Sequence, residues 1–307
     1  MLEDTYQEIV VWGLLNRRHS HRFIHKGFYE NLSAMHTDVY WLENSKKMNF
    51  SPFKRRLIFA SGMASSNLPI LPNTDYVLHN VHLTHNQQHA SEILNSKILR
   101  LQVHTSDSAG EKHRDSPYIS FDLKNRTLFQ PWGTPTPRHE WRTLTNKNLT
   151  KIEYWIGAVW NNKQNQGNLE IIETYKKILG KYSIEFRRIG GSRFRKDGIS
   201  EARAADIVRE SRLGAAIVGE WQRQSKYVPC RIFKNIAAGV PPISNGDYTD
   251  LFGSALLFSP DIERLVQEAI SESTSSKQTR LEEAQHAARA HTYEANIVRI
   301  VEALGQF

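Results

Sequence analysis

Short apolar runs that alternate with amphipathic segments constrain the fold of this chain more than any other feature of its sequence. Residues 8–12 read EIVVW, a β-branched and aromatic run closed by Gly13, which is typical of a strand buried in a parallel sheet. Residues 21–35 then place apolar side chains near the helical period. This alternation predicts an α/β fold with a doubly wound, mainly parallel sheet.

The same alternation continues along the whole chain. In the first half we expect further strands at 38–42, 57–60, 76–78 and 98–103. Residues 129–137 read FQPWGTPTP, which is too rich in proline for a helix or a central strand, so we interpret 105–150 as a linker between two domains. In the second half we expect strands at 154–160, 184–189, 215–218, 242–244 and 255–258, helices at 168–179, 200–212, 229–238, 261–271 and 280–304, and a serine-rich loop at 271–276.

The composition describes a soluble globular protein. Hydrophobic residues make up 39% of the 307 residues and charged ones 23%, which excludes a disordered or fibrous chain. No apolar run approaches the roughly 20 residues that cross a bilayer, and the acidic start MLEDTYQ differs from a secretory signal. Cys230 is the single cysteine, so no intrachain disulfide can form. These features predict a cytoplasmic protein without a structural zinc site.

The formal net charge of +8 favours polyanionic partners. Phosphorylated small molecules, acidic lipid head groups and nucleic acid all belong to this class. The bases lie in short, dispersed clusters such as 17–18, 54–56 and 193–196, a distribution more typical of solvated surface than of one nucleic-acid footprint. We therefore keep peripheral membrane contact as a secondary expectation and nucleic acid as a weaker alternative.

The segment 227–245, YVPCRIFKNIAAGVPPISN, carries the strongest candidate site. Pro229 near the first helical position leaves a helix N-terminus whose N–H groups attract phosphate. Arg231, Lys234 and Asn235 are spaced i, i+3, i+4 and share one helical face, which suits a pyrophosphate and a ribose. An amphipathic helix with a solvated basic face explains the same pattern.

Ligands of doubly wound sheets bind beyond the carboxyl ends of the strands, and three more loops have suitable residues there. Asn161 offers an amide after one predicted strand. Gly190 and its glycine neighbour let N–H groups approach an anion, with Arg193 adding charge, although a plain turn is the alternative. Trp221 is either a stacking platform for a base or a core tryptophan. The predicted donor-binding residues are Trp160, Asn161, Gly190, Gly191, Arg193, Trp221, Tyr227, Pro229, Arg231, Lys234, Asn235 and Asn245.

The segment 227–245 resembles the donor-binding helix of GT-B glycosyltransferases, which is followed by an Ala-Gly-x-Pro-x-Ile turn, here AGVPPI. CgeB-like and family-one glycosyltransferases carry a similar stretch. Many of them have a glutamate in this helix that holds the donor ribose, where this chain has Lys234 and Asn235. The resemblance spans about 150–304 and includes HTYE at 291–294, which is similar to the start of a closing helix that crosses back onto the first domain.

The resemblance implies two Rossmann-like doubly wound domains that face a cleft. Residues 1–145 would form the N-terminal acceptor and catalytic domain with its linker, 146–280 the nucleotide-sugar domain, and 281–307 a helix that crosses back. The implied enzyme transfers a hexosyl or deoxyhexosyl group from a nucleoside-diphosphate sugar to a glycan, a lipid-linked sugar or a small molecule. A glycosyltransferase that modifies DNA bases and a non-catalytic protein that binds nucleotide sugars stay as alternatives.

Polar residues that follow predicted strands of the first half are the candidate catalytic groups. His19 and His21 lie in a basic loop, and His104 and Asp107 follow a later strand; one of the four would act as the base. Two surface histidines around an N-cap serine explain the first pair equally well. The chain has no Asp-x-Asp motif, so we expect no metal site and no cofactor besides the nucleotide sugar. A helix dipole and basic side chains would then neutralise the leaving diphosphate.

Overall fold

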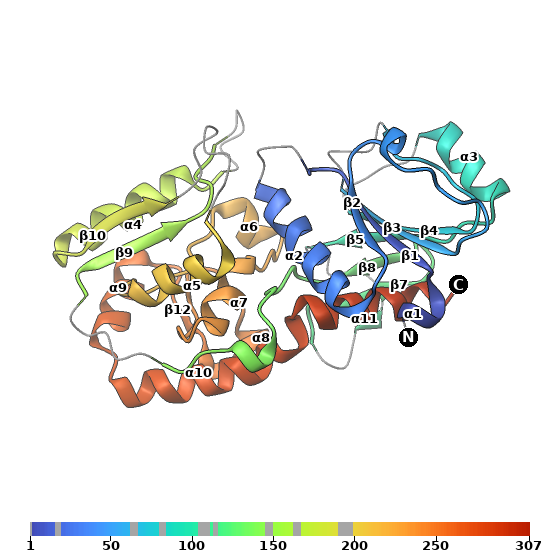
Figure 1. The fold of residues 1–307 in the computed structure, drawn as a ribbon. Helices are drawn as coiled ribbons and strands as arrows, with labels where there is room; N and C mark the ends of the chain where they lie inside the picture. Colours follow the sequence, from blue (N-terminus) through green and yellow to red (C-terminus); the bar gives the residue numbers. More distant parts are fainter. Residues whose placement is uncertain are drawn as a thin grey trace.

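The N-terminal domain is built on one eight-stranded sheet (Figure 1). The computed structural model describes residues 2–15, 20–61, 67–79, 84–103, 111–112, 116–144, 150–161, 167–189 and 199–307. The strands lie in the order β2-β1-β3-β4-β5-β8-β7-β6, of which the first six are parallel and β7 is antiparallel to both its neighbours. This order is that of a doubly wound sheet, so the predicted fold class is confirmed. The strands are β1 Glu8–Trp12, β2 Val39–Leu42, β3 Arg56–Ser61, β4 Thr74–His79, β5 Ile98–Gln102, β6 Glu111–Lys112, β7 Ser120–Asp122 and β8 Thr127–Phe129.

Alternate residues of the central strands enter two different cores. Val11 lies in a large cluster that the helices α2 (Ser20–Met35) and α11 (Tyr293–Leu304) cover, whereas Trp12 faces a smaller cluster closed by loop residues such as Leu68. Because strand side chains point alternately to the two faces, EIVVW is buried throughout only when both faces are covered. The domain is completed by α1 (Leu2–Thr5), η1 (Ser45–Lys47) and α3 (His85–Ile93).

The linker between the domains is shorter than the predicted 105–150. β7 and β8 form a hairpin that extends the sheet, and β6 pairs with β7, so the chain still belongs to the N-terminal domain at Phe129. The proline-rich residues that follow are irregular and lead into η3 (Arg138–Glu140). Strands of two or three residues are too short for their alternation to show in the sequence.

The C-terminal domain repeats the α/β plan with two separate pairs of strands. β9 (Ile152–Ile156) runs parallel to β10 (Glu185–Ile189), and β11 (Ile243–Ser244) runs parallel to β12 (Leu257–Phe258). The predicted strand 215–218 has no regular strand pairing in the structure, although the Ala216 N–H donates to Ile243 O at 2.8 Å. The helices are α4 Leu169–Lys181, α5 Glu201–Glu210, α6 Glu220–Gln224, α7 Cys230–Ala237, α8 Thr249–Phe252, η4 Gly253–Ala255, α9 Ile262–Ser271 and α10 Thr274–Ala288.

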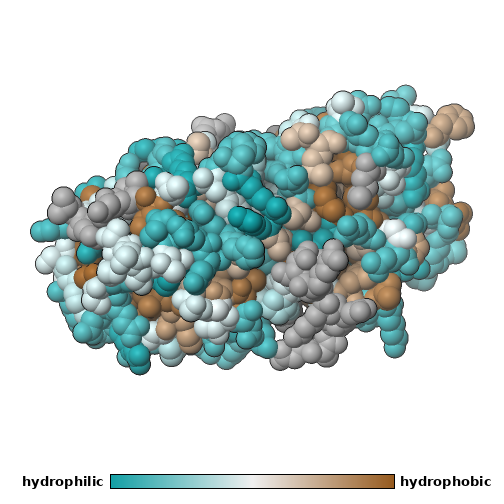
Figure 2. Space-filling model, turned by 90° about the horizontal axis from the view of Figure 1, so that it is seen from below, coloured by the Kyte–Doolittle hydropathy of each residue, from teal (hydrophilic) through white to brown (hydrophobic). Residues whose placement is uncertain are grey.

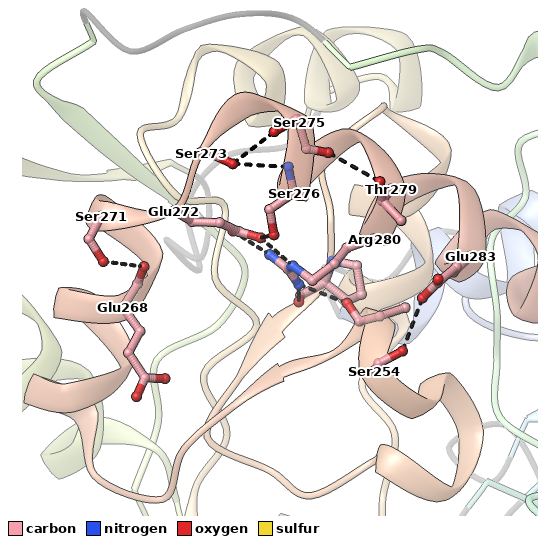
Figure 3. A network of polar contacts seen from close by, with 12 residues as sticks. Ser254, Glu268, Ser271, Glu272, Ser273, Ser275, Ser276, Thr279, Arg280 and Glu283 are labelled. Carbon is pink, nitrogen blue, oxygen red and sulfur yellow. Dashed lines mark hydrogen bonds and ion pairs between the residues drawn. The ribbon is translucent and has the colours of Figure 1, made fainter.

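The serine-rich segment 271–276 begins a helix instead of forming a loop. Ser273 caps α10, since its side chain accepts a hydrogen bond from a first-turn N–H at 3.1 Å. Arg280 pairs with Glu272 across the corner between α9 and α10 at 2.6 Å (Figure 3). Serine is unfavourable inside helices but favoured at their N-caps, so a cluster of serines resembles a loop until the cap is placed.

Two helices replace the single C-terminal helix predicted for 281–307. α10 packs within the C-terminal domain, the chain turns at η5 (Arg289–His291), and α11 packs on the N-terminal sheet beside α2 (Figure 1). The Phe28 ring of α2 stacks on Tyr293 with 4.5 Å between ring centres. The interruption therefore lies where the chain passes from one domain to the other.

Hydrophilic residues cover most of the face seen in Figure 2, with smaller apolar areas between them. In the part of the chain that the structure describes, no helix combines the length and the apolar character that a membrane span requires. Peripheral membrane contact stays a prediction.

Candidate functional site

The candidate site lies where β9 ends beside the start of α7. The apolar face of α7, with Phe233 at its centre, is buried among residues of α8, η4 and α10. Its other face turns toward the sheet, where Arg231 Nη2 donates to Ile156 O at 2.9 Å. The helix therefore holds a cation at the carboxyl end of β9, the edge at which ligands of doubly wound sheets bind.

Arg231 carries a guanidinium group that forms no salt bridge among the described residues, and the buried Glu153 carboxylate acts on it only through its charge. Its Cζ lies 3.4 Å from the centre of the Trp155 ring. Its Nε is buried and has no hydrogen-bond partner. Burial lowers the pKa of Arg231 to about 10, so the group stays protonated at neutral pH. A half-buried cation whose buried Nε–H has no acceptor favours an anionic ligand.

Gly157 leaves open the space that the Arg231 guanidinium occupies. Its φ of +139° lies in a region that favours glycine, and an added Cβ would lie 2.7 Å from Arg231 Nη2 and 4.0 Å from Trp155 Nε1. Trp155 is 2% exposed, and its Nε1 also has no hydrogen-bond partner. The buried Trp155 N–H without an acceptor and the Arg231 guanidinium therefore both lie close to this glycine.

Glu153 is a buried residue of β9 that holds the segment 213–215 beside this strand. Its carboxylate accepts four hydrogen bonds, from the N–H groups of Leu213 (2.8 Å), Gly214 (3.1 Å) and Ala215 (3.1 Å) and from the Tyr175 hydroxyl (3.0 Å). Burial raises the pKa of Glu153, and these donors oppose that shift. Because its oxygens are occupied, Glu153 acts as a scaffold rather than as a ligand contact.

The start of α7 lies at the contact between the domains. Pro229 is the N-cap residue and provides no side-chain cap, so the first N–H groups of the helix need other partners. Tyr227 and Cys230 pack against the core of the N-terminal domain, and burial raises the pKa of the Tyr227 hydroxyl. Both domains therefore contribute to the surroundings of this helix end.

The two tryptophans of the predicted donor set are partly exposed. Trp160 follows β9 and is 39% exposed. The side chain of Asn168 holds this loop, accepting from Trp160 N–H at 3.0 Å and donating to Ala158 O at 3.2 Å. Trp221 on α6 is also 39% exposed, which excludes the alternative of a core tryptophan. Asn161 is exposed next to Trp160, and the ligand role of all three stays a prediction.

Two residues of the predicted donor set serve the backbone of the domain. Asn235 is 2% exposed, and its Nδ2 donates to Gly214 O at 2.5 Å. Asn245 is 1% exposed and pairs with the N–H and the C=O of Val218 at 2.8 and 3.0 Å. Part of the helix face that we predicted to bind the ligand therefore faces the interior of the domain. Lys234 on the same helix is half-buried.

Only part of the predicted set can be placed. Gly190, Gly191, Arg193, His19, His104 and Asp107 lie outside the described residues. His21 lies in the first turn of α2, and its ring centre is 5.5 Å from that of His79 at the end of β4. His79 packs edge-on against Trp132 at 4.2 Å.

The described His, Cys, Asp and Glu residues form no group of three that could hold a metal ion.

The sequence analysis missed Trp155, Gly157 and His79. Two of these residues had a signal in the sequence. Gly157 directly follows a strand and His79 ends a strand, the positions at which ligands of doubly wound sheets bind. Trp155 gave no such signal, because an inward-facing aromatic residue in a strand is usually part of a core.

The arrangement of both domains is similar to that of two solved glycosyltransferases. One is a trehalose-6-phosphate synthase studied for glycosyl transfer with retention; it has a TM-score of 0.53 at 10% identity, over 98% of this chain and 99% of that chain. The other is an alpha-glucosyltransferase in complex with UDP, with a TM-score of 0.53 at 8% identity, over 97% of this chain and 99% of that chain. This chain has the GT-B fold.

The GT-B fold predicted from the sequence is thereby confirmed. No protein-family model matches the chain, and no curated protein sequence does. At identities near 10% the likeness concerns the fold alone, so the narrower resemblance to CgeB-like proteins stays a prediction.

Proposed function

We propose that the chain is a glycosyltransferase that binds a nucleoside-diphosphate sugar at the start of α7. The observation that carries this proposal is Arg231, a half-buried and protonated guanidinium at the carboxyl end of β9, which forms no salt bridge among the described residues and whose buried Nε–H has no acceptor. A diphosphate supplies the missing anion and also the acceptors for the first N–H groups of α7. The similar alpha-glucosyltransferase in complex with UDP makes uridine diphosphate the first nucleotide to test.

The proposed reaction needs positive charge where the diphosphate leaves. The bond between the anomeric carbon of the sugar and the diphosphate oxygen breaks, and its electron pair stays on that oxygen. An acceptor hydroxyl forms the new bond to the anomeric carbon and loses its proton to a base. Arg231 and the α7 N-terminus stabilise the charge that develops on the leaving group. Because the protein supplies this charge, we propose transfer without a divalent metal and without a further cofactor.

The N-terminal domain would bind the acceptor and provide the base. His19, His21, His104 and Asp107 keep this predicted role, and His21 is the one that the structure describes. The acceptor would be a hydroxyl of a glycan, a lipid-linked sugar or a small molecule. Release of UDP from UDP-glucose that depends on an added acceptor would separate a transferase from a protein that only binds nucleotide sugars.

Calorimetric titration of UDP tests the donor site. Arg231→Ala should weaken UDP binding about 10- to 100-fold, because charge-assisted hydrogen bonds contribute about 1.5–3 kcal/mol. Arg264→Ala is the matched control: Arg264 is 72% exposed on α9 and pairs with Glu268, so its loss should leave the affinity unchanged. Equal affinity of Arg231→Ala and wild type, or no binding of UDP, GDP or dTDP to wild type, would contradict the proposal.

A further inference from the structure

We propose that Trp155 is a positioning residue, whose indole ring holds Arg231 in the orientation that receives the diphosphate. This inference rests on the proposed function and concerns the same site. Trp155 itself would not need to touch the ligand. Its role would be to fix the plane of the guanidinium group before the anion arrives.

The ring of Trp155 is a rigid support. It is 2% exposed and packs in a core cluster with Ile172, Tyr175 and Leu213. β9 pairs with β10 along its whole length, which fixes the backbone below the ring. A ring held on these sides cannot follow the movements of a flexible side chain, so it restricts whatever stacks on it.

The contact with Arg231 has the geometry of a cation–π interaction. The guanidinium carbon lies 3.4 Å from the ring centre, well within the 6 Å limit for such contacts, and the contact is stronger when buried than at exposed sites. Nη2 is held by Ile156 O at 2.9 Å, while Nε has no partner. The ring and the carbonyl fix the group while its buried Nε–H stays available to a ligand. Such preorganisation lowers the entropy lost on binding.

Gly157 provides a second way to disturb the same orientation. An alanine there would place Cβ 2.7 Å from Arg231 Nη2, too close for the present position of the guanidinium group. This substitution leaves the Trp155 side chain unchanged, but an alanine is strained at a φ of +139°. The urea unfolding of this variant therefore separates a change in the orientation of Arg231 from a loss of stability.

One other role of Trp155 makes a different prediction. Its Nε1 is a buried donor without a partner and could bind the anion directly. Phenylalanine keeps an aromatic face but has no N–H, whereas leucine keeps neither. The two substitutions therefore distinguish a supporting ring from a direct hydrogen bond.

Titration of UDP into Trp155→Phe, Trp155→Leu, Gly157→Ala and Arg231→Ala tests the inference, with folding checked by circular dichroism and urea unfolding. We expect Trp155→Phe to bind within about threefold of wild type, and Trp155→Leu and Gly157→Ala about tenfold more weakly, which corresponds to about 1.4 kcal/mol. In the Arg231→Ala background, Trp155→Leu should cause no further loss, because the ring acts through the arginine.

Four results would overturn the inference. The first is a Trp155→Phe variant as weak as Trp155→Leu, which would make the indole N–H a direct contact. The second is an equal loss from Trp155→Leu with and without Arg231, which would make the effect a general one on packing. If Arg231→Ala weakens UDP binding but neither Gly157→Ala nor Trp155→Leu does, this inference fails while the donor site stands. If wild type binds no nucleoside diphosphate, both fail.

Discussion

At the scale of single residues, His25 is an unusual member of the N-terminal core. It lies on α2 with no exposed surface, 5.2 Å from the Phe59 ring centre, and neither ring nitrogen has a hydrogen-bond partner. Burial, with a smaller contribution from His21, lowers the pKa of His25 from 6.5 to about 3. A buried polar group without partners lowers stability by about 1–3 kcal/mol.

Replacing His25 should stabilise the protein, and more so in acid. In the unfolded chain the His25 imidazole binds a proton near pH 6.5, whereas in the folded chain it stays neutral down to about pH 3. Because the unfolded chain then binds more protons, this histidine lowers the free energy of unfolding as pH falls through 6.5. At pH 5 the loss amounts to about 2 kcal/mol. We expect His25→Leu to remove this loss and to add about 1 kcal/mol at pH 7.5.

Urea unfolding at pH 5.0 and 7.5 measures both effects. His139→Leu is the control, because His139 is 82% exposed and its substitution should change stability by less than about 0.5 kcal/mol. Parallel pH dependences of wild type and His25→Leu would show that the folded protein protonates this imidazole at the same pH as the unfolded chain.

At the scale of elements, an asparagine side chain helps to hold the predicted strand 215–218 in place in the C-terminal domain. The predicted strand 215–218 is joined to β11 by Ala216 N–H and by Ser244 Oγ, which donates to Ala216 O at 2.8 Å. The amide of Asn245 then bonds both backbone groups of Val218. A primary amide can replace a peptide unit in this way, because it has one acceptor and two donors.

Asn245→Ala should therefore lower the free energy of unfolding by about 2–4 kcal/mol, since it leaves the buried N–H and C=O of Val218 without partners. Chemical denaturation followed by circular dichroism measures the change. The matched control is Gln88→Ala, an exposed amide on α3, for which we expect a change below about 0.5 kcal/mol. A small effect at Asn245 would mean that water takes over both hydrogen bonds.

At the scale of the whole molecule, the two segments that cross between the domains are bonded to each other. Thr134 N–H donates to His291 O, and Tyr293 N–H donates to Thr134 O, both at 2.9 Å. The His291 ring meets Ser116 Oγ at 3.0 Å and lies 4.8 Å from the Phe233 ring centre. The crossing thus joins the N-terminal sheet, the C-terminal helix and α7 in one buried contact.

Gly133→Ala should disrupt this crossing. Gly133 has a φ of +70°, and a Cβ there would lie 1.9 Å from His291 O. The alanine therefore requires either a shift of the backbone or the loss of the two hydrogen bonds that Thr134 makes with His291 and Tyr293. We expect a loss of about 3 kcal/mol and, in differential scanning calorimetry, two separate transitions in place of one. Gly180→Ala is the control, because nothing lies within 4 Å of its added Cβ. A single transition at the wild-type temperature would contradict this account of the crossing.

The sequence by itself determined the α/β class and most of the elements. The predicted strand 8–12 and helix 21–35 agree with β1 and α2 to within one residue, because apolar periodicity reflects burial directly. Pro229 was placed correctly at the start of α7, since proline acts on its own backbone. Local rules of this kind do not depend on which segments later become neighbours.

The tertiary structure decided which side chains face one another. Arg231, Lys234 and Asn235 are equivalent on a helical wheel, but only the fold turns Asn235 into the sheet and sets Arg231 against Trp155 and Ile156. The break between α10 and α11 is likewise decided by the N-terminal core that receives Tyr293. Contacts between residues distant in the chain depend on the packing of whole elements, and periodicity along one segment carries no information about its partners.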